Sequence, residues 1–222
     1  MWRSEIERIG LDAGDEGAPY DRKAATYDRL VRSRTYNRVL WGASPADYEA
    51  FALRALDAGA GPLLDVAGGS AAATAHLYAH ASREVVLVDR SRAMLGRAQA
   101  RIARACGPLE LTPHVRLVQA DALRLAWVPH RFETVLCMGL MHIVADPEAL
   151  LRALCEQAQP TGKVYFTSLV ADRGVGAAYL RLLHRAGEVA APRTSAELSA
   201  ALGGLELEVR GNMAYGVATN SG

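Results

Sequence analysis

Three aspartates, Asp65, Asp89 and Asp121, stand at or just beyond the ends of short apolar runs. The first run continues into Gly68-Gly69, and Asp89 follows Gly69 by 20 residues. This interval is expected when an acid binds the ribose hydroxyls of a ligand that a glycine loop holds at its other end. A carboxylate suits vicinal hydroxyls because it is an acceptor only and can take both protons. The acids therefore predict a site for a ligand with a ribose, with Asp121 placed to accept from an exocyclic amine such as that of adenine.

Each aspartate also has a purely structural alternative. Asp89 can cap the helix that follows it, Asp65 can accept from nearby backbone amides, and Asp121 can cap a turn. His76 and His80 have the i, i+4 spacing of a metal-binding pair. Without a third ligand in the sequence they favour a surface pair, and we expect no metal site.

The loop after the first apolar run has fewer glycines than a diphosphate needs. A dinucleotide-binding loop reads G-x-G-x-x-G, and the later glycine is missing after Gly68-Gly69. A nicotinamide-dependent oxidoreductase is therefore the less favoured alternative, also because Tyr-x-x-x-Lys is absent and Lys163 falls within an expected strand. The loop therefore does not favour a diphosphate as ligand.

The elements that position the acids alternate between strand and helix. The expected strands are Pro62–Val66, Glu84–Val88, Val115–Gln119, Thr134–Met138 and Lys163–Leu169. The helices expected between them are an Ala-rich segment ending near Ser82, Ser91–Cys106, and Pro147–Ala158 behind Asp146 as its cap. Strand–helix alternation at this spacing predicts right-handed crossovers and a parallel sheet with helices on both faces.

The two ends of the chain differ from this alternation. Helices are expected at Gly176–Ala190 and Thr194–Leu202, followed by strands at Leu205–Arg210 and Ala214–Thr219 that are close enough for a hairpin. The fold class is thus α/β: a Rossmann-like, doubly wound, mostly parallel sheet with a C-terminal antiparallel β-hairpin. Residues 1–19 are expected to be a flexible lead-in and residues 20–222 one domain. This domain divides into an N-terminal helical cap at 20–58, broken near Ser44-Pro45, and a core at 59–222.

Composition restricts the possible partners of the chain. The 222 residues carry a formal net charge of +1, so no strong field attracts nucleic acid. The three cysteines form no C-x-x-C pair, which favours a reducing compartment. The sequence has neither a signal-peptide core nor an apolar run of about 20 residues, so we expect a cytoplasmic protein without a membrane span.

Five segments in order resemble the motifs of class I S-adenosylmethionine-dependent methyltransferases. They are Asp65–Ser70 (DVAGGS), Val88–Ser91 (VDRS) with Met94-Leu95, Gln119–Ala122 (QADA), Phe132–His142 (FETVLCMGLMH) and Gly162–Val164 (GKV). The stretch Tyr20–Asp28 (YDRKAATYD) is similar to the Y-D-x-x-A-x-x-Y-D segment of the small-molecule branch, such as quinone methyltransferases.

The resemblance implies S-adenosylmethionine as cofactor, S-adenosylhomocysteine as product, and a set of site residues. Asp65 is then expected to contact the ammonium group, Asp89 the ribose, Asp121 the adenine amine and Met94 the adenine ring. Tyr27 is a candidate lid residue. The full set of implied cofactor-binding residues is Tyr27, Asp65, Ala67, Gly68, Gly69, Asp89, Arg90, Met94, Ala120, Asp121, Ala122 and Met138.

Two departures and one candidate base qualify the resemblance. The family usually has glycine where this chain has Ala67 and Ala71, and Ala67 fits only if its φ is negative. His142 is the candidate catalytic residue, because it lies past the fourth strand end and an imidazole can take a proton at neutral pH. The alternative is a hydrogen-bonded histidine at the rim of the site.

The sequence therefore predicts an enzyme that transfers a methyl group to a small, apolar or aromatic acceptor. The segment CMGLMH, Cys137–His142, replaces the Asn/Asp-Pro-Pro-Tyr/Phe motif of many nucleic-acid methyltransferases, so no nucleic acid is expected as substrate. The alternative is a non-catalytic or repurposed S-adenosylmethionine-binding domain. The chain is expected to be a monomer or a homodimer.

Overall fold

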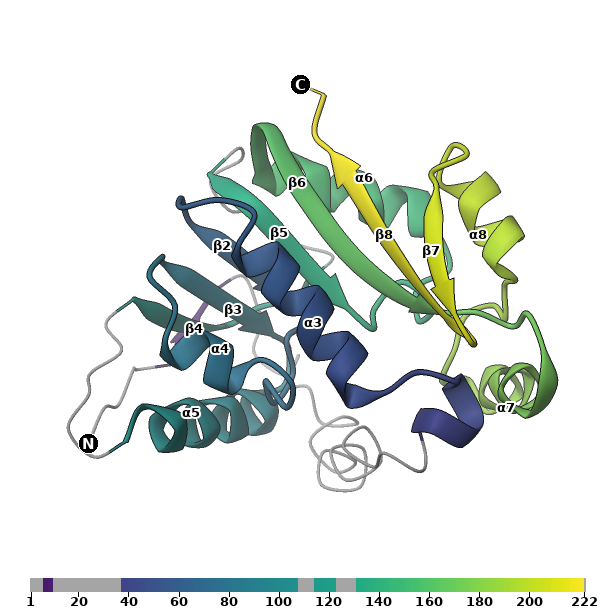
Figure 1. Ribbon diagram of the computed structural model, residues 1–222, viewed down its shortest axis with the longest axis horizontal. Helices are drawn as coiled ribbons and strands as arrows, with labels where there is room; N and C mark the ends of the chain where they lie inside the picture. The colour runs from purple at the N-terminus through teal and green to yellow at the C-terminus, as the bar shows by residue number, and fades with distance from the viewer. Residues whose placement is uncertain (1–5, 10–36, 108–113, 123–130, 222) are drawn as a thin grey trace.

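A computed structural model describes residues 6–9, 37–107, 114–122 and 131–221 of the chain. The first half of the predicted cap, including Tyr27, lies outside the described residues. Within them the chain forms one eight-stranded sheet in the order β1-β4-β3-β2-β5-β6-β8-β7 (Figure 1). The strands are β1 Glu7–Arg8, β2 Leu63–Val66, β3 Val85–Asp89, β4 Val115–Gln119, β5 Phe132–Met138, β6 Ala158–Leu169, β7 Leu207–Arg210 and β8 Met213–Thr219.

The sheet is parallel from β1 to β6 and ends in an antiparallel hairpin. β8 runs antiparallel to β6, and β7 antiparallel to β8, which confirms the predicted terminal hairpin and the fold class. The chain passes outward from β2 through β3 to β4 and then returns to the other side of β2 with β5. The carboxyl ends of β2 and β5 therefore flank the switch point, where open α/β sheets bind their ligands.

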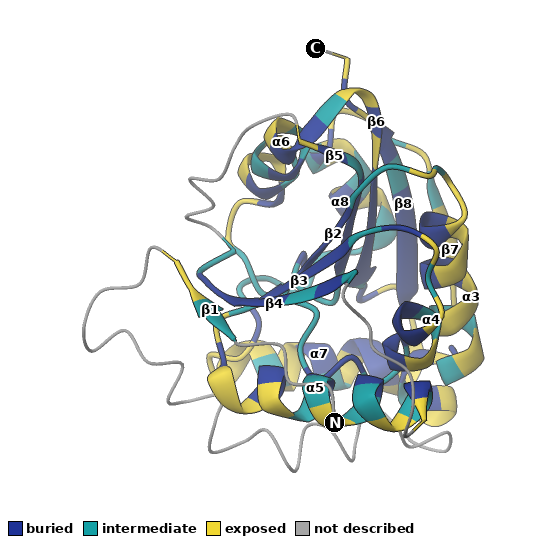
Figure 2. Cartoon of the chain, turned by 90° about the vertical axis from the view of Figure 1, so that its left-hand side faces the viewer, coloured by how far each residue is buried: buried dark blue, intermediate teal, exposed yellow. Residues whose placement is uncertain are grey.

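Helices cover both faces of the sheet. They are the π-helical turn η1 Asn37–Trp41, α3 Pro45–Leu56, α4 Ala75–Ala79, α5 Arg92–Cys106, α6 Pro147–Gln157, α7 Gly174–Arg185 and α8 Ser195–Ala201. α3, α4 and α5 lie on the face toward the viewer in Figure 1, and α6 and α8 on the opposite face. Figure 2 shows the resulting pattern of buried strands between helices whose outer sides are exposed.

Helix caps form as predicted from the sequence. Ser44 caps α3 in a capping box with Asp47, and Pro45 occupies the first turn. The Oδ1 of Asp146 accepts from the backbone N–H of Ala149 at 2.9 Å at the start of α6. Thr194, expected as the first residue of its helix, instead caps α8 and forms a second capping box with Glu197. These local signals set the observed starts of three helices.

Other expectations are corrected by the structure. The Ala-rich helix is only α4, starting at Ala75, because the preceding loop continues through Ala71. β6 starts at Ala158, earlier than expected, and α7 spans Gly174–Arg185. β1 pairs with β4 inside the expected flexible lead-in.

The described part of the predicted cap, residues 37–58, contains η1 and α3. α3 does not lie over the strand ends. Its apolar stripe, with Phe51, Ala52 and Ala55, packs on the sheet against β5, β6 and β8, because this spacing places the three side chains on one helical face. Only η1 joins the segment beyond β6, where Trp41 packs against Tyr179 of α7 with ring centroids 5.8 Å apart.

Candidate functional site

Asp65 lies in the central strand β2 and is almost completely buried, at 1% exposure. Its Oδ2 accepts a hydrogen bond from the hydroxyl of Tyr78 in α4 at 2.8 Å. Its Oδ1 is buried and has no hydrogen-bond partner among the described residues. Burial, offset in part by the Tyr78 bond and reinforced by the nearby charge of Asp89, raises the pKa of Asp65 to about 7. A buried carboxylate oxygen without a hydrogen-bond donor destabilises the fold. The environment of Asp65 is therefore suited to binding a cation or an N–H donor.

The loop after β2 contains three left-handed residues, of which two are alanines. The φ angles are +56° at Ala67, +56° at Gly69 and +50° at Ala71. The condition under which Ala67 would replace glycine without strain, a negative φ, is therefore not met. The loop keeps the left-handed backbone conformation that glycines normally adopt, and the Cβ atoms of Ala67 and Ala71 add strain to it.

Gly68 is required for a different reason, namely space. A Cβ at this position would lie 2.5 Å from the Oδ2 of Asp65 and 2.8 Å from the Cγ of Leu87. The backbone N–H of Gly68 donates to the carbonyl of Val88 at 3.1 Å, which holds the loop against β3. The loop thus approaches the buried acid as closely as a residue without a side chain allows.

Replacing Ala67 by glycine should raise the thermal midpoint of unfolding. An L-residue in the left-handed region destabilises the folded state by roughly 1–2 kcal/mol. Glycine removes this strain, but its greater freedom in the unfolded chain lowers the free energy of unfolding by about 0.4–1 kcal/mol. Ala71→Gly is the matched comparison, because its methyl is buried at 2% and its loss costs about 0.8 kcal/mol. We expect a net gain for Ala67→Gly and almost no change for Ala71→Gly in calorimetric scans. Equal shifts in both variants would contradict this account of the loop.

Asp89 connects the first loop to the end of β3. Its Oδ2 accepts from the backbone N–H of Gly69 at 2.8 Å, and its Oδ1 accepts from the N–H of Ser91 at 2.8 Å. The cap of α5 is Ser91, whose Oγ accepts from the N–H of Met94 at 3.1 Å. A carboxylate oxygen can accept two hydrogen bonds, so these contacts are compatible with ribose binding. The predicted interval of 20 residues thus corresponds to direct contact between the loop and the acid.

The remaining predicted residues lie around the same edge of the sheet. Ala120 is buried just after β4, and its N–H donates to the carbonyl of Asp89 at 3.2 Å. Asp121 and Ala122 follow it and are partly exposed. The side chain of Gln119 donates to the carbonyl of Arg90 at 3.1 Å, while the Arg90 side chain is exposed.

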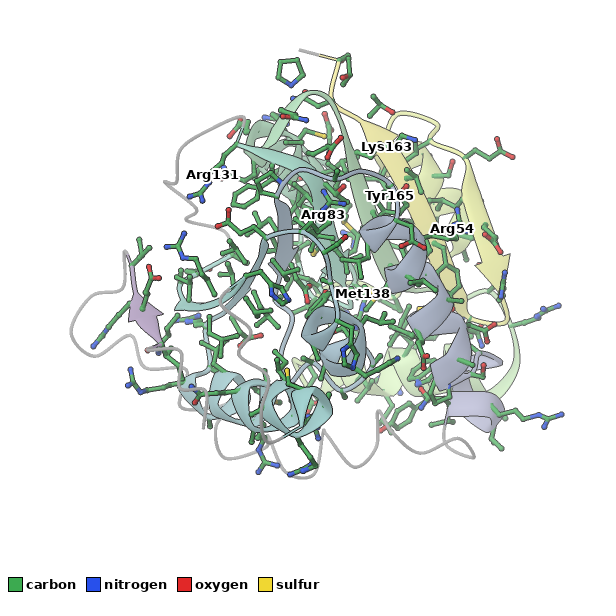
Figure 3. The ribbon with its side chains drawn as sticks, turned by 60° about the vertical axis from the view of Figure 1, so that its left-hand side comes forward. Arg54, Arg83, Arg131, Met138, Lys163 and Tyr165 are labelled. Carbon is green, nitrogen blue, oxygen red and sulfur yellow. The ribbon has the colours of Figure 1, made fainter. Side chains whose placement is uncertain are left out.

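Met94 and Met138 lie on two elements at this edge, α5 and β5. Met94 is 6% exposed in the first turn of α5. Met138 is the last residue of β5, is partly buried, and precedes Gly139 with a φ of +87°. Figure 3 labels Met138 at the carboxyl end of the strand, away from Arg83, which precedes β3 at the opposite edge.

His142 occupies a position that does not favour general-base catalysis. It is 8% exposed, and its Nδ1 accepts a long hydrogen bond of 3.4 Å from the N–H of Leu169. Burial lowers the pKa of His142 to about 4, so the ring is neutral at pH 7. A neutral imidazole that accepts at Nδ1 carries its proton on Nε2 and has no second acceptor. This hydrogen bond corresponds to the alternative raised from the sequence, a hydrogen-bonded histidine, and the role of His142 as a base stays a prediction.

Tyr78 is the contact that the sequence analysis missed. It is fully buried and lies 13 residues after Asp65, in a helix whose start was misplaced. The available signal was a tyrosine inside an Ala-rich apolar segment behind a strand with a central acid. The guanidinium of Arg101 was missed as well and donates to the carbonyl of Ser70 at 2.7 Å, which fastens the loop to α5.

The buried arginine at the opposite edge is structural. Arg83 donates to the carbonyl of Leu56 at 3.0 Å and to the Oγ1 of Thr134 at 3.1 Å, and its carboxylate partner is Glu133 at 3.5 Å. Across the described segments no group of three or more His, Cys, Asp or Glu residues has a metal-binding arrangement. Within the same segments no helix is long and apolar enough to span a bilayer.

The residues at the switch point fit S-adenosylmethionine, the cofactor that the motifs imply. Its ammonium group meets the requirement of the unpartnered Oδ1 of Asp65. Its ribose requires an acceptor at the end of the second strand, where Asp89 lies. It has no phosphate, so the missing third glycine of a diphosphate loop is not needed.

Comparison with known proteins supports the same assignment. The sequence profile of a methyltransferase domain family matches residues 63–162. The chain is 32% identical over 106 residues to a ubiquinone biosynthesis O-methyltransferase of Methylococcus capsulatus, and this match covers 48% of the chain and 42% of the relative. A ubiquinone biosynthesis O-methyltransferase of Neisseria meningitidis is 42% identical over 41 residues, or 18% of the chain and 17% of the relative. The chain thus spans less than half the length of these relatives.

Solved structures share the fold at low sequence identity. A putative methyltransferase of Bacillus halodurans has a TM-score of 0.58 at 22% identity, with 73% of this chain and 70% of that chain covered. A phosphoethanolamine N-methyltransferase of Haemonchus contortus, solved with S-adenosyl-L-methionine, has a TM-score of 0.64 at 16% identity, with coverages of 90% and 46%. The [4+2]-cyclase SpnF has a TM-score of 0.65 at 15% identity, with coverages of 92% and 76%.

The matched domain includes the first loop, Asp89 and the end of β5. Sheet order, motif order and this match agree: over residues 63–162 the chain is similar to a methyltransferase domain family, and it shares its fold with solved methyltransferase structures.

Proposed function

We propose that the protein transfers the methyl group of S-adenosylmethionine to a small-molecule acceptor. The observation that carries the proposal is the 2.8 Å hydrogen bond between the Gly69 N–H and the Asp89 carboxylate. It joins the glycine loop and the second-strand acid at the switch point of the sheet.

Each side chain at this edge receives a role from its chemistry. Asp65 binds the ammonium group, and Asp89 binds the ribose hydroxyls while it holds the loop. Asp121 accepts from the adenine amine, and Met94 packs on the adenine ring. Met138 lines the cofactor side of β5, and Ala67, Gly68, Gly69, Arg90, Ala120 and Ala122 contribute backbone near the cofactor.

The bound cofactor supplies an electrophilic methyl group on a sulfonium that is already a good leaving group. The contribution of the protein is then to align an acceptor with that methyl group and to exclude water. The segment from η1 and α7 beyond the end of β6 is proposed to bind the acceptor, because Trp41, Tyr179 and Leu180 give it an apolar interior. A small apolar or aromatic acceptor suits it, as in the name of the ubiquinone O-methyltransferase relatives.

Asp89→Ala should weaken S-adenosylhomocysteine binding at least tenfold in isothermal titration calorimetry, because a charge-assisted hydrogen bond contributes about 1.5–3 kcal/mol. Asp89→Asn, which keeps one acceptor oxygen, should retain more affinity than Asp89→Ala. The same titration with NAD(H) should give no heat of binding. Unchanged affinity in Asp89→Ala would remove this residue from the site, and tight NAD(H) binding would favour the oxidoreductase alternative.

One further candidate function is a repurposed cofactor-binding domain. Two observations favour it: the strained alanines in the loop, and the fold shared with the cyclase SpnF. Turnover decides between the two. Formation of S-adenosylhomocysteine with a panel of phenolic and quinol acceptors supports methyl transfer, whereas tight binding without any turnover on that panel supports the repurposed domain.

A further inference from the structure

Tyr78 is the one described side chain that donates to the buried carboxylate of the site. Its ring and hydroxyl are fully buried, and the hydroxyl lies 2.8 Å from the Oδ2 of Asp65. The helix that carries it is fixed at its other side, where the Nε2 of His114 lies 2.9 Å from the carbonyl of Tyr78. The hydroxyl therefore has a set position and a set partner.

Apart from Tyr78, the surroundings of Asp65 disfavour the ionised form of its carboxyl group. Burial is the main cause that raises the pKa of Asp65, and the charge of Asp89, which faces it from β3, adds to this shift. Burial, and then the charge of Asp65, raises the pKa of the Cys137 thiol in β5. Tyr78, from α4, is the group that lowers the pKa of Asp65. Burial, together with the charge of Asp65 and the hydrogen bond to it, raises the pKa of the tyrosine. His114 contacts the backbone of Tyr78 and not the carboxylate.

The two carboxylate oxygens of Asp65 differ in their hydrogen bonding. Tyr78 holds Oδ2 by a hydrogen bond. Gly68 leaves space beside this oxygen, because it has no Cβ and a Cβ there would lie 2.5 Å from Oδ2. Oδ1 has no partner among the described residues although it is buried. A neutral hydroxyl can orient a carboxylate and stabilise its charged form without competing as a counter-ion.

We infer that Tyr78 is a positioning residue for cofactor recognition: its hydroxyl holds Oδ2 of Asp65 so that Oδ1, charged and unpartnered, binds the ammonium group of S-adenosylmethionine. The inference rests on the proposed function. It makes ligand binding a proton-linked event at this one carboxylate. In the ligand-free chain the carboxyl shares its proton with solvent near neutral pH, and the arriving cation releases that proton.

The direction in which ligand affinity changes with pH follows from the raised pKa of Asp65. Because the ligand cation binds the ionised form of Asp65, whose pKa is about 7, affinity should rise with pH and level off above neutrality. The rise should be roughly fivefold between about pH 6 and pH 7. This window lies below the ordinary range of an α-amino group, about 7.7–8.0, so the ligand itself remains protonated.

The experiment is titration calorimetry with S-adenosylhomocysteine at about pH 6, 6.5 and 7, in buffers of different ionisation enthalpy, which yields the number of protons released. Wild type should release about half a proton at pH 7. Tyr78→Phe keeps the buried ring and removes the hydroxyl. It should lose roughly tenfold in affinity at pH 7 and release close to one proton, because its Asp65 titrates at higher pH.

Two further variants complete the test. Asp65→Asn should bind weakly and release no proton from this site at any pH. Tyr215→Phe is the matched control, because Tyr215 is buried at 4% and its hydroxyl has no partner among the described residues. It should match wild type in affinity and proton release.

The outcomes separate the inference from the function on which it rests. If wild type binds and Tyr78→Phe loses the same factor at every pH, with proton release unchanged, Tyr78 has only a packing role and the inference is overturned. The same holds if Tyr78→Phe matches wild type. If wild type binds no adenosyl ligand, the proposed function fails first and the inference fails with it.

Discussion

Asp65→Asn should make the ligand-free protein more stable at about pH 8 and remove most of its affinity for adenosyl ligands. The pKa of Asp65 rises on folding from 3.8 to about 7. Between these values the folded state binds more protons than the unfolded state, so the free energy of unfolding falls as pH rises through this window and is level above it. At about 1.4 kcal/mol per pH unit, this interval amounts to at most roughly 4 kcal/mol.

Asparagine has nearly the same shape, can accept from Tyr78 and carries no buried charge. Urea unfolding at about pH 5 and pH 8 should show a strong pH dependence in wild type and little from this site in the variant. The control is Asp146→Asn, at the exposed cap of α6, where asparagine caps equally well and stability should change by less than about 0.5 kcal/mol. A variant that is less stable than wild type at pH 8 would refute the interpretation of Asp65 as a destabilising charge kept for binding.

Gly68→Ala should destabilise the fold by roughly 1–3 kcal/mol and lower ligand affinity by more than tenfold. The added methyl would lie 2.5 Å from the Oδ2 of Asp65 and 2.8 Å from the Cγ of Leu87. Both side chains are fully buried in the central strands and cannot withdraw without moving β2 or β3. The loop must therefore shift, and the shift displaces the carboxylate that binds the ammonium group.

Gly96→Ala is the matched control for this prediction. Gly96 lies within α5 and is exposed, and a Cβ added there would meet no neighbouring side chain or distant backbone atom within 4 Å. There alanine should stabilise the helix by up to about 1 kcal/mol. Urea midpoints for the two variants should move in opposite directions. Equal behaviour would mean that the loop at Gly68 relaxes without cost.

The sequence predicted those parts of the fold that depend on local signals. The strand runs, the caps Ser44 and Asp146, and the C-terminal hairpin all follow from side-chain type and short-range spacing. The interval between Gly69 and Asp89 was also informative, because it corresponds to a contact across two neighbouring parallel strands. These signals were enough to identify the edge of the sheet that binds the ligand.

Other parts could not be predicted because tertiary contacts override local preference. Three consecutive alanines favour a helix, but packing of Ala71 in the core and the bond from Arg101 to Ser70 keep that segment as a loop. The Tyr78–Asp65 bond depends on how far the helix start is delayed, so no local pattern indicates it. Burial of His142 depends on residues distant in the sequence, because the N–H groups of Leu169, at the end of β6, and of Ala190, beyond α7, both donate to it.

The bond from the Gly69 N–H to Asp89 has a consequence for the kinetics of binding. Since the loop is tied to the second strand by the fold itself, most of the entropy of ordering it is lost during folding and not on encounter with the ligand. Such a pre-organised loop allows association in a single step, with no slow rearrangement preceding or following encounter. Differences in affinity among adenosyl ligands should then reside in their dissociation rates.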